Sequence, residues 1–150
     1  HGDFEMAKFR GTKGNDVFTV STSTLAGSSI LGGTGYDTIK LTNTGKISFS
    51  AASAQNLAGI DAIDLSAHKS GWAEVLLNAA LMDQSDGSAL TITSGAGGID
   101  LLKADASIGG TVIVAGTGDI HLAALNLRFD SDVGFITMFN ICAVCATLQW

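Results

Sequence analysis

The chain has 150 residues, 46% of them hydrophobic, and a formal net charge of −6 at pH 7. A chain of this length forms one domain, and its apolar content excludes disorder as a description of the whole. The 8 Lys and Arg residues are too few for a nucleic-acid binder that neutralises phosphates. The acids are 12 Asp but only 2 Glu, which favours a turn-rich β protein with carboxylates in its loops.

Short runs rich in Ile, Val, Leu and Thr recur along the chain, bounded by Gly, Ser, Asn and Asp. In chain order, we expect strands at Val17–Val20, Thr38–Thr42, Lys46–Phe49, Ile60–Leu65, Glu74–Asn78, Leu90–Thr93, Gly98–Leu102, Thr111–Ala115, Asp119–Leu122 and Asn126–Phe129. Two stretches, Ala51–Ala58 and Ala79–Gln84, favour one or two helical turns each.

The spacing of these runs fits a sandwich, a barrel or a stacked solenoid. Several runs resemble one another, as Asp37-Thr-Ile-Lys-Leu and Asp61-Ala-Ile-Asp-Leu do, and Asp86-Gly87 is the one two-residue hairpin signal. A solenoid buries its apolar residues by stacking similar windings on one another. We therefore expect an all-β, single-domain parallel β-solenoid of the β-roll or β-helix type with Gly-Asp turns.

The two ends of the chain differ from the middle. Residues 1–10 lack the apolar stretch of a secretory signal peptide, and we expect them to be a lead-in or cloning remnant. Residues 11–132 would form the solenoid. The segment Val133–Trp150 carries no charge, and its β-branched and aromatic content favours a strand over a membrane span. We expect a terminal strand or cap there, buried on the domain or between copies of the chain; a C-terminal export signal stays an alternative.

The most informative string is Gly32-Gly33-Thr34-Gly35-Tyr36-Asp37-Thr38-Ile39-Lys40. It fits the nonapeptide G-G-x-G-x-D-x-U-x, where U is a large apolar residue, at every fixed position. Residues 11–19 and 95–103 fit with Thr12 and Ala96 in place of the second glycine. Residues 115–119 hold two glycines, with Asp119 one position early.

These strings resemble the repeats-in-toxin (RTX) family of secreted bacterial calcium-binding β-rolls. The resemblance implies that adjacent windings share a Ca²⁺ ion, which prefers six to eight oxygen ligands. The ligands it implies are the carboxylates of Asp16 and Asp37 and the carbonyls of Gly11, Gly14, Gly33 and Gly35, with Asp100 as a further candidate. The alternative is that each Asp hydrogen-bonds the backbone of its own turn.

The motifs are dispersed here, whereas the family stacks them in tandem. Asp16 and Asp37 lie 21 residues apart, and Asp37 and Asp100 lie 63 apart, which is three times 21. A winding of about 21 residues would follow, but no Asp at that spacing fills the gap between Asp37 and Asp100. Only the pair Asp16 and Asp37 is therefore expected to form a shared site.

The resemblance also implies a module of an exported bacterial surface protein, secreted or held at the cell surface. We expect it to be non-catalytic, with a task in adhesion, assembly or scaffolding, and to fold when extracellular calcium neutralises its acidic charge. No G-x-S-x-G, P-loop or H-E-x-x-H motif is present. A polysaccharide-active enzyme fragment is the least favoured alternative.

The lone C-x-x-C pair, Cys142 and Cys145, is interpreted as two small buried apolar side chains.

A second function stays open, because aromatic side chains on an exposed face bind sugar rings. Trp72 lies in a polar loop and is the best exposed candidate, and Tyr36 occupies a variable position of the full motif. His68 lies in the same polar loop as Trp72, where we expect it to be solvated. The alternative is therefore a carbohydrate-binding module with Trp72 and His68 near a polysaccharide or cell-surface ligand.

Overall fold

The computed structural model describes residues 7–25, 28–49, 57–77, 90–103, 112–121 and 136–138. Almost all regular structure in these ranges is β-strand, and the single helix α1 has four residues. The elements are β1 (Lys8–Arg10), β2 (Val17–Val20), α1 (Thr22–Leu25), β3 (Ser29–Leu31), β4 (Thr38–Leu41), β5 (Ile47–Ser48), β6 (Leu57–Ala58), β7 (Ala62–Asp64), β8 (Ala73–Leu77), β9 (Leu90–Ser94), β10 (Ile99–Lys103), β11 (Val112–Gly116), β12 (Ile120–His121) and β13 (Ile136–Met138).

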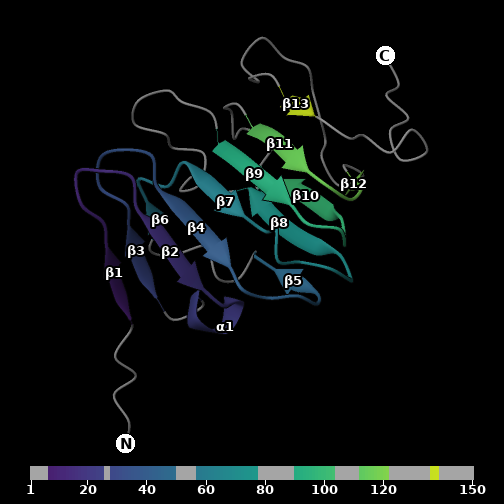
Figure 1. Ribbon diagram of the computed structural model, residues 1–150, viewed down its shortest axis with the longest axis horizontal. Coiled ribbons are helices and arrows are strands. Elements are labelled where there is room, and N and C mark those ends of the chain that lie inside the picture. Colours follow the sequence, from purple (N-terminus) through teal and green to yellow (C-terminus); the bar gives the residue numbers. More distant parts are fainter. Residues whose placement is uncertain are drawn as a thin grey trace, which may run out of the picture.

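The strands form three parallel sheets. Sheet A has the order β1-β3-β6, sheet B the order β13-β11-β9-β7-β4-β2, and sheet C the order β12-β10-β8-β5. The chain visits the sheets in turn, for example through β3, β4 and β5 and then through β6, β7 and β8, so that each passage is one winding of a coil. Successive windings stack in chain order from β1 and β2 toward β11 and β13 (Figure 1). The expected all-β parallel solenoid is confirmed.

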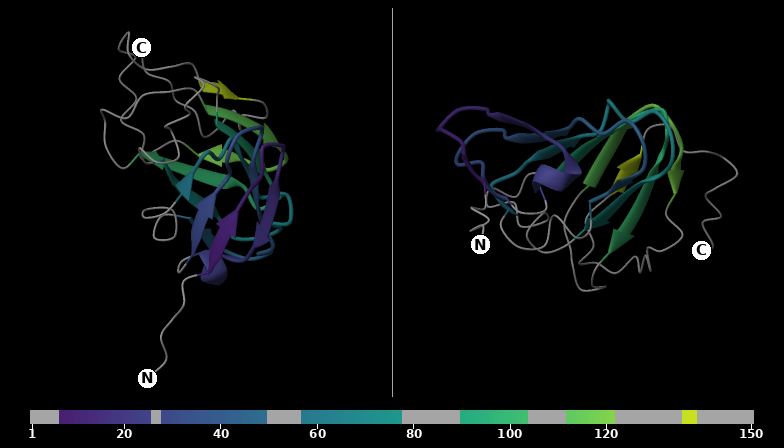
Figure 2. Two further views of the ribbon diagram at one scale, coloured as in Figure 1. Left: turned by 90° about the vertical axis from the view of Figure 1, so that its left-hand side faces the viewer. Right: turned by 90° about the horizontal axis from the view of Figure 1, so that it is seen from below.

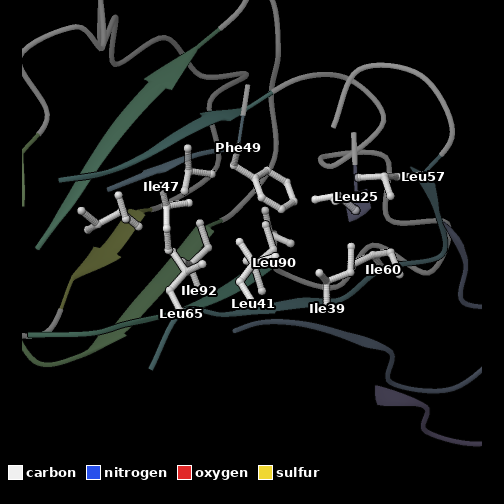
Figure 3. Close-up of a cluster of buried hydrophobic side chains, with 14 of the residues drawn as sticks. Leu25, Ile39, Leu41, Ile47, Phe49, Leu57, Ile60, Leu65, Leu90 and Ile92 are labelled. Carbon is white, nitrogen blue, oxygen red and sulfur yellow. The ribbon is translucent and has the colours of Figure 1, made fainter. Parts of the chain in front are cut away.

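The core consists of aliphatic columns that run along the solenoid axis. In sheet B the strand register aligns Phe18, Ile39, Ile63, Ile92 and Val114, and all five are buried. Alternation along each short strand places one set of side chains inside and the next outside. Figure 3 shows how side chains from sheets B and C and from the turns meet in this interior. Stacking therefore supplies the hydrophobic contacts that no single winding makes alone.

The first winding differs from the later ones on its third side. The helix α1 follows β2 at the point where the next windings enter the strands of sheet C. Its residue Leu25 is fully buried in the core, so this short helix covers the apolar interior at that end. Figure 2 shows the first windings at one end of the stack and β11 and β13 at the other. The sequence did not predict this helix.

The length of a winding is not constant. In the sheet B column, 21 residues separate Phe18 from Ile39, 24 separate Ile39 from Ile63, and 29 separate Ile63 from Ile92. The paired strands of sheet B keep their register although the windings differ in length. In this column of sheet B the 21-residue spacing therefore occurs only between Phe18 and Ile39.

Sheet A was not expected from the sequence. Its strand β1 lies within the segment interpreted as a lead-in, and β6 includes Leu57 and Ala58, which were expected to be helical. Strand β13 lies within the expected C-terminal strand or cap and pairs with β11. The expected strand at 126–129, the expected helix at 79–84 and the cysteine pair lie outside the described residues. Across the described ranges, no helix is long and apolar enough to cross a membrane.

Candidate functional site

The connections from sheet A to sheet B, called the A–B turns below, carry the Gly-Asp motifs. The first A–B turn is residues 11–16, the second is residues 32–37 and the third is residues 59–61. In the second turn Gly33 and Gly35 have φ of +103° and +117°, a region that L side chains rarely adopt. The glycines are thus required by the turn geometry at these two positions.

One aspartate from each A–B turn enters a ladder between windings. The backbone N–H of Asp16 donates to Oδ1 of Asp37 at 2.9 Å, and the N–H of Asp37 donates to Oδ2 of Asp61 at 2.8 Å. The N–H of Asp61 in turn donates to the backbone carbonyl of Asp37 at 2.9 Å. The carboxylates of Asp37 and Asp61 therefore each accept a hydrogen bond from the winding before their own, which holds the turns in register.

The first turn also closes on itself. Oδ2 of Asp16 accepts hydrogen bonds from the backbone N–H of Thr12 at 2.6 Å and from its hydroxyl at 3.0 Å. This bond is the turn chemistry that the sequence left open as an alternative to metal ligation. Oδ1 of Asp16 accepts no hydrogen bond from the described part of the chain, and the residue is partly exposed.

Asp37 is the unusual member of the ladder. Its side chain is fully buried, and Oδ2 has no hydrogen-bond partner among the described residues. Burial raises the pKa of this carboxyl above 3.8, the hydrogen bond from the Asp16 N–H opposes the rise, and the charges of Asp16 and Asp61 add to it. A buried carboxylate oxygen without a partner is costly, so Asp37 needs either a proton or a cation.

Backbone carbonyl oxygens crowd the space between the turns. A Cβ atom on Gly33 would lie 2.3 Å from the carbonyl oxygen of Thr12, and one on Gly35 would lie 2.6 Å from that of Gly14. A Cβ on Gly32 would lie 2.6 Å from Oδ2 of Asp37 itself. The absence of side chains therefore lets carbonyls of one winding approach the backbone of the next, and the added Cβ on Gly32 would also lie 2.0 Å from the carbonyl oxygen of Gly59.

The structure brings together most of the residues expected at a metal site. Gly11, Gly14 and Asp16 lie in the first A–B turn, and Gly33, Gly35 and Asp37 lie in the second, directly above it in the stack. Among the described residues, no three His, Cys, Asp or Glu side chains converge in a way that would hold a metal. A cation here would therefore depend on backbone carbonyls as well as carboxylates, which suits the ligand preference of Ca²⁺.

Asp61 was missed as a member of this column. Its segment Asp61-Ala-Ile-Asp-Leu repeats the pattern of Asp37-Thr-Ile-Lys-Leu, and that similarity was the available signal. The spacing concealed it, since 24 residues rather than 21 separate the two aspartates. A register argument based on the apolar column would have found it, because Ile39 and Ile63 are paired.

Asp100 lies in another sheet. It belongs to β10 in sheet C, where the register places it beside Glu74 of β8 and in line with His121 of β12. Its glycine-rich segment, residues 95–98, connects sheet B to sheet C, so it is stacked with different turns. The 63-residue spacing from Asp37 is therefore a coincidence of sequence and does not place Asp100 in the aspartate ladder.

His68 is buried, so the expectation of a solvated loop residue is wrong. Only 1% of its surface is exposed, and neither ring nitrogen has a hydrogen-bond partner in the described ranges. Its ring lies against Gly97 of the next winding, where a Cβ would come within 2.3 Å of the imidazole Cε1. The polar composition of residues 66–71 suggested an exposed loop. Residues of the neighbouring winding cover the His68 side chain, which the local sequence does not reveal.

The two aromatic candidates are exposed as expected. Trp72 and Tyr36 each keep 44% of their surface accessible. Tyr36 lies in the second A–B turn beside Asp37, where its N–H donates to the side chain of Asn15 at 2.9 Å. Trp72 lies in the connection between β7 and β8, which joins sheet B to sheet C. The two side chains therefore belong to different corners of the winding and do not form one platform.

The fold defines this chain as a parallel β-solenoid with stacked Gly-Asp turns. No family model matches the chain, and no curated protein or solved structure matches it either.

Proposed function

We propose that this chain is a non-catalytic, calcium-binding β-solenoid module of a secreted or cell-surface bacterial protein. The observation that carries the proposal is the buried Oδ2 of Asp37, which has no hydrogen-bond partner among the described residues. A divalent cation would satisfy this oxygen and offset the burial of its charge.

The ligands that we assign to calcium come from the first two A–B turns. Asp37 supplies Oδ2 and Asp16 supplies Oδ1, while the Asp16 Oδ2 stays with Thr12. The carbonyls of Gly14 and Thr12 support the assignment, because they project toward the glycines of the next winding. A hard cation that accepts carbonyl and carboxylate oxygens in flexible geometry suits such a set.

The charge of the chain supports a role in folding. With a net charge of −6 and a buried acid in the stack, the calcium-free chain has to bring carboxylates together against repulsion. Calcium bound between windings would couple their stacking to the calcium level of the surroundings. Such coupling suits a module that folds outside the cell and serves there in adhesion, assembly or scaffolding, and the RTX-like motifs favour the same setting.

Calorimetric titration with CaCl₂ tests the proposal. We expect the wild-type chain to bind calcium and Asp37→Asn to lose at least about tenfold in affinity. Asp100→Asn is the matched control, because it removes the same charge from sheet C and should leave the affinity unchanged. Equal calcium affinity in the wild type and Asp37→Asn, or no binding at all, would refute the assignment.

Terbium luminescence locates the ion independently. The chain contains a single tyrosine, Tyr36, which lies next to Asp37 in the proposed site. Tb³⁺ in place of Ca²⁺ should show luminescence sensitised by Tyr36, and Tyr36→Phe should lose this component without losing calcium affinity. Luminescence that is identical in Tyr36→Phe and the wild type would place the ion elsewhere.

A further inference from the structure

The indole of Trp72 is held at the surface by the next winding. Its Cζ3 and Cε3 atoms would lie 3.0 and 3.3 Å from a Cβ on Gly98, so the ring packs on the backbone of that glycine. Gly98 has a φ of +82°, which no ordinary side chain adopts readily. The following residue in the strand, Ala73, is buried, whereas Trp72 keeps 44% of its surface exposed. The ring thus packs on the backbone of Gly98 while a large part of the residue stays accessible to solvent.

Groups of opposite charge flank this ring along the solenoid axis. Ile47 pairs with Ala73, so Lys46 takes the position beside Trp72 in the winding before. Ile99 pairs with Ile120, so Asp119 takes the position beside Gly98 in the winding after. Lys46 and Asp119 are both exposed. The order across sheet C is therefore a cation, an indole, a glycine without a side chain, and an anion.

We propose that this surface, defined by Lys46, Trp72, Gly98 and Asp119, binds a neutral sugar ring of a polysaccharide. The apolar face of a sugar packs on an aromatic ring, and its hydroxyl groups both donate and accept hydrogen bonds at its rim. Lys46 supplies donors and Asp119 supplies acceptors on opposite sides of the indole. An anionic ligand such as a uronate would meet Asp119, and the acids Glu74 and Asp100 follow two residues along the neighbouring strands, so charge disfavours an anionic ligand.

This assignment differs from the one that the sequence suggested. His68 takes no part, because its side chain is buried beneath the same turn. The site also lies between sheets B and C, away from the A–B turns, so it contains none of the residues assigned to calcium. The competing role for Trp72 is to shield the Gly98 backbone from water, and this role predicts a change in stability without any ligand.

Titration with neutral oligosaccharides tests the inference. Cellohexaose and maltohexaose serve as neutral probes and hexagalacturonate as the anionic one, each added to about 10 mM in calcium and again in EDTA. The indole N–H resonance of Trp72, assigned with Trp72→Phe, reports contact at the site. We expect it to shift with at least one neutral hexasaccharide, equally in calcium and EDTA, and to respond less to hexagalacturonate.

Two alanine variants complete the test. Trp72→Ala should lower the affinity about tenfold or more, whereas Tyr36→Ala, which changes an equally exposed aromatic at another corner, should leave it unchanged. No binding of either neutral probe, equal affinity in Trp72→Ala, or stronger binding of hexagalacturonate would each overturn the inference. A lower melting temperature of Trp72→Ala with no glycan binding in the wild type would assign the shielding role instead.

Discussion

The backbone N–H of Asp16 donates to Oδ1 of Asp37 at 2.9 Å, across 21 residues of sequence. The other oxygen of the same carboxylate, Oδ2, is buried and has no hydrogen-bond partner among the described residues. One oxygen of this carboxyl group therefore holds two windings in register. The other is buried without a hydrogen bond, so a proton or a cation would stabilise it. Variants of Asp37, of the turn glycines and of the core distinguish the effect of the hydrogen bond from that of the buried oxygen and from core packing.

The first prediction concerns how the contribution of Asp37 to stability depends on pH in the absence of calcium. Burial raises the pKa of its carboxyl above 3.8, so the folded state holds the proton more tightly than the unfolded state. The stabilisation from this group is present below pH 3.8 and is lost as the pH rises through the raised pKa. In EDTA, the unfolding free energy of the wild type relative to Asp37→Asn should therefore fall as the pH rises.

Urea denaturation of both proteins at steps between about pH 4 and pH 7 measures this difference. The comparison with Asp37→Asn cancels the titration of the other acids, and the asparagine Oδ1 can still accept the Asp16 N–H. A difference that stays constant over this range, or that grows with pH, would contradict the burial argument.

Close contact between the turns gives the second prediction. A Cβ on Gly32 would lie 2.0 Å from the carbonyl oxygen of Gly59 and 2.6 Å from Oδ2 of Asp37. Because the backbone must shift, Gly32→Ala should destabilise the fold by about 1–3 kcal/mol. At Gly45 nothing lies within 4 Å of the added atom, so Gly45→Ala should change stability by less than about 0.5 kcal/mol. Equal effects in thermal melts of the two variants would contradict the turn packing.

Much of sheets B and C could be predicted from the sequence, because their strands carry apolar residues in alternation. Strand β2 was predicted with its observed limits, and β9 and β10 within one residue at each end. Sheet A was missed because β1 lies in the segment interpreted as a lead-in and β6 in one expected to be helical, and the sheet is formed by stacking between windings rather than by a local sequence pattern.

The candidate site, too, was predicted in part and missed in part. The pairing of Asp16 with Asp37 followed from the nonapeptide pattern, because the first two windings repeat at 21 residues. Asp61 was missed because windings vary in length, and Asp100 was misplaced because a glycine-rich turn occurs at two different corners. Strand register decides these assignments, and register is set by contacts between windings rather than by sequence spacing.

The third prediction concerns the aliphatic column of sheet B. Ile63 is fully buried between Ile39 and Ile92 in the register, so Ile63→Ala leaves a cavity in the middle of the stack. We expect a loss of about 2–5 kcal/mol in unfolding free energy. Val17→Ala removes apolar surface from a side chain that is 63% exposed, and its expected effect is within about 0.5 kcal/mol. A small loss for Ile63→Ala in urea denaturation would place the core elsewhere.

The fourth prediction concerns His68. Its two ring nitrogens are buried without hydrogen-bond partners in the described ranges, so the polar ring contributes little that an apolar side chain of similar size does not. We expect His68→Leu to leave the melting temperature unchanged or to raise it. The expected gain in unfolding free energy is about 1 kcal/mol at most. A clear fall in the melting temperature would show that the imidazole makes a polar interaction that stabilises this turn.

Calcium-dependent melting of the wild type and Asp37→Asn tests the central claim most directly. With calcium at about a hundred times its Kd, linkage predicts about 2.7 kcal/mol of stabilisation, or a rise of about 5–10 °C for a domain of this size. Asp37→Asn, which binds at least about tenfold more weakly, should show about half of this rise or less. Asp100→Asn should show the full rise, since Asp100 lies in sheet C. The same melting temperature in calcium and in EDTA for the wild type would contradict calcium binding at Asp37.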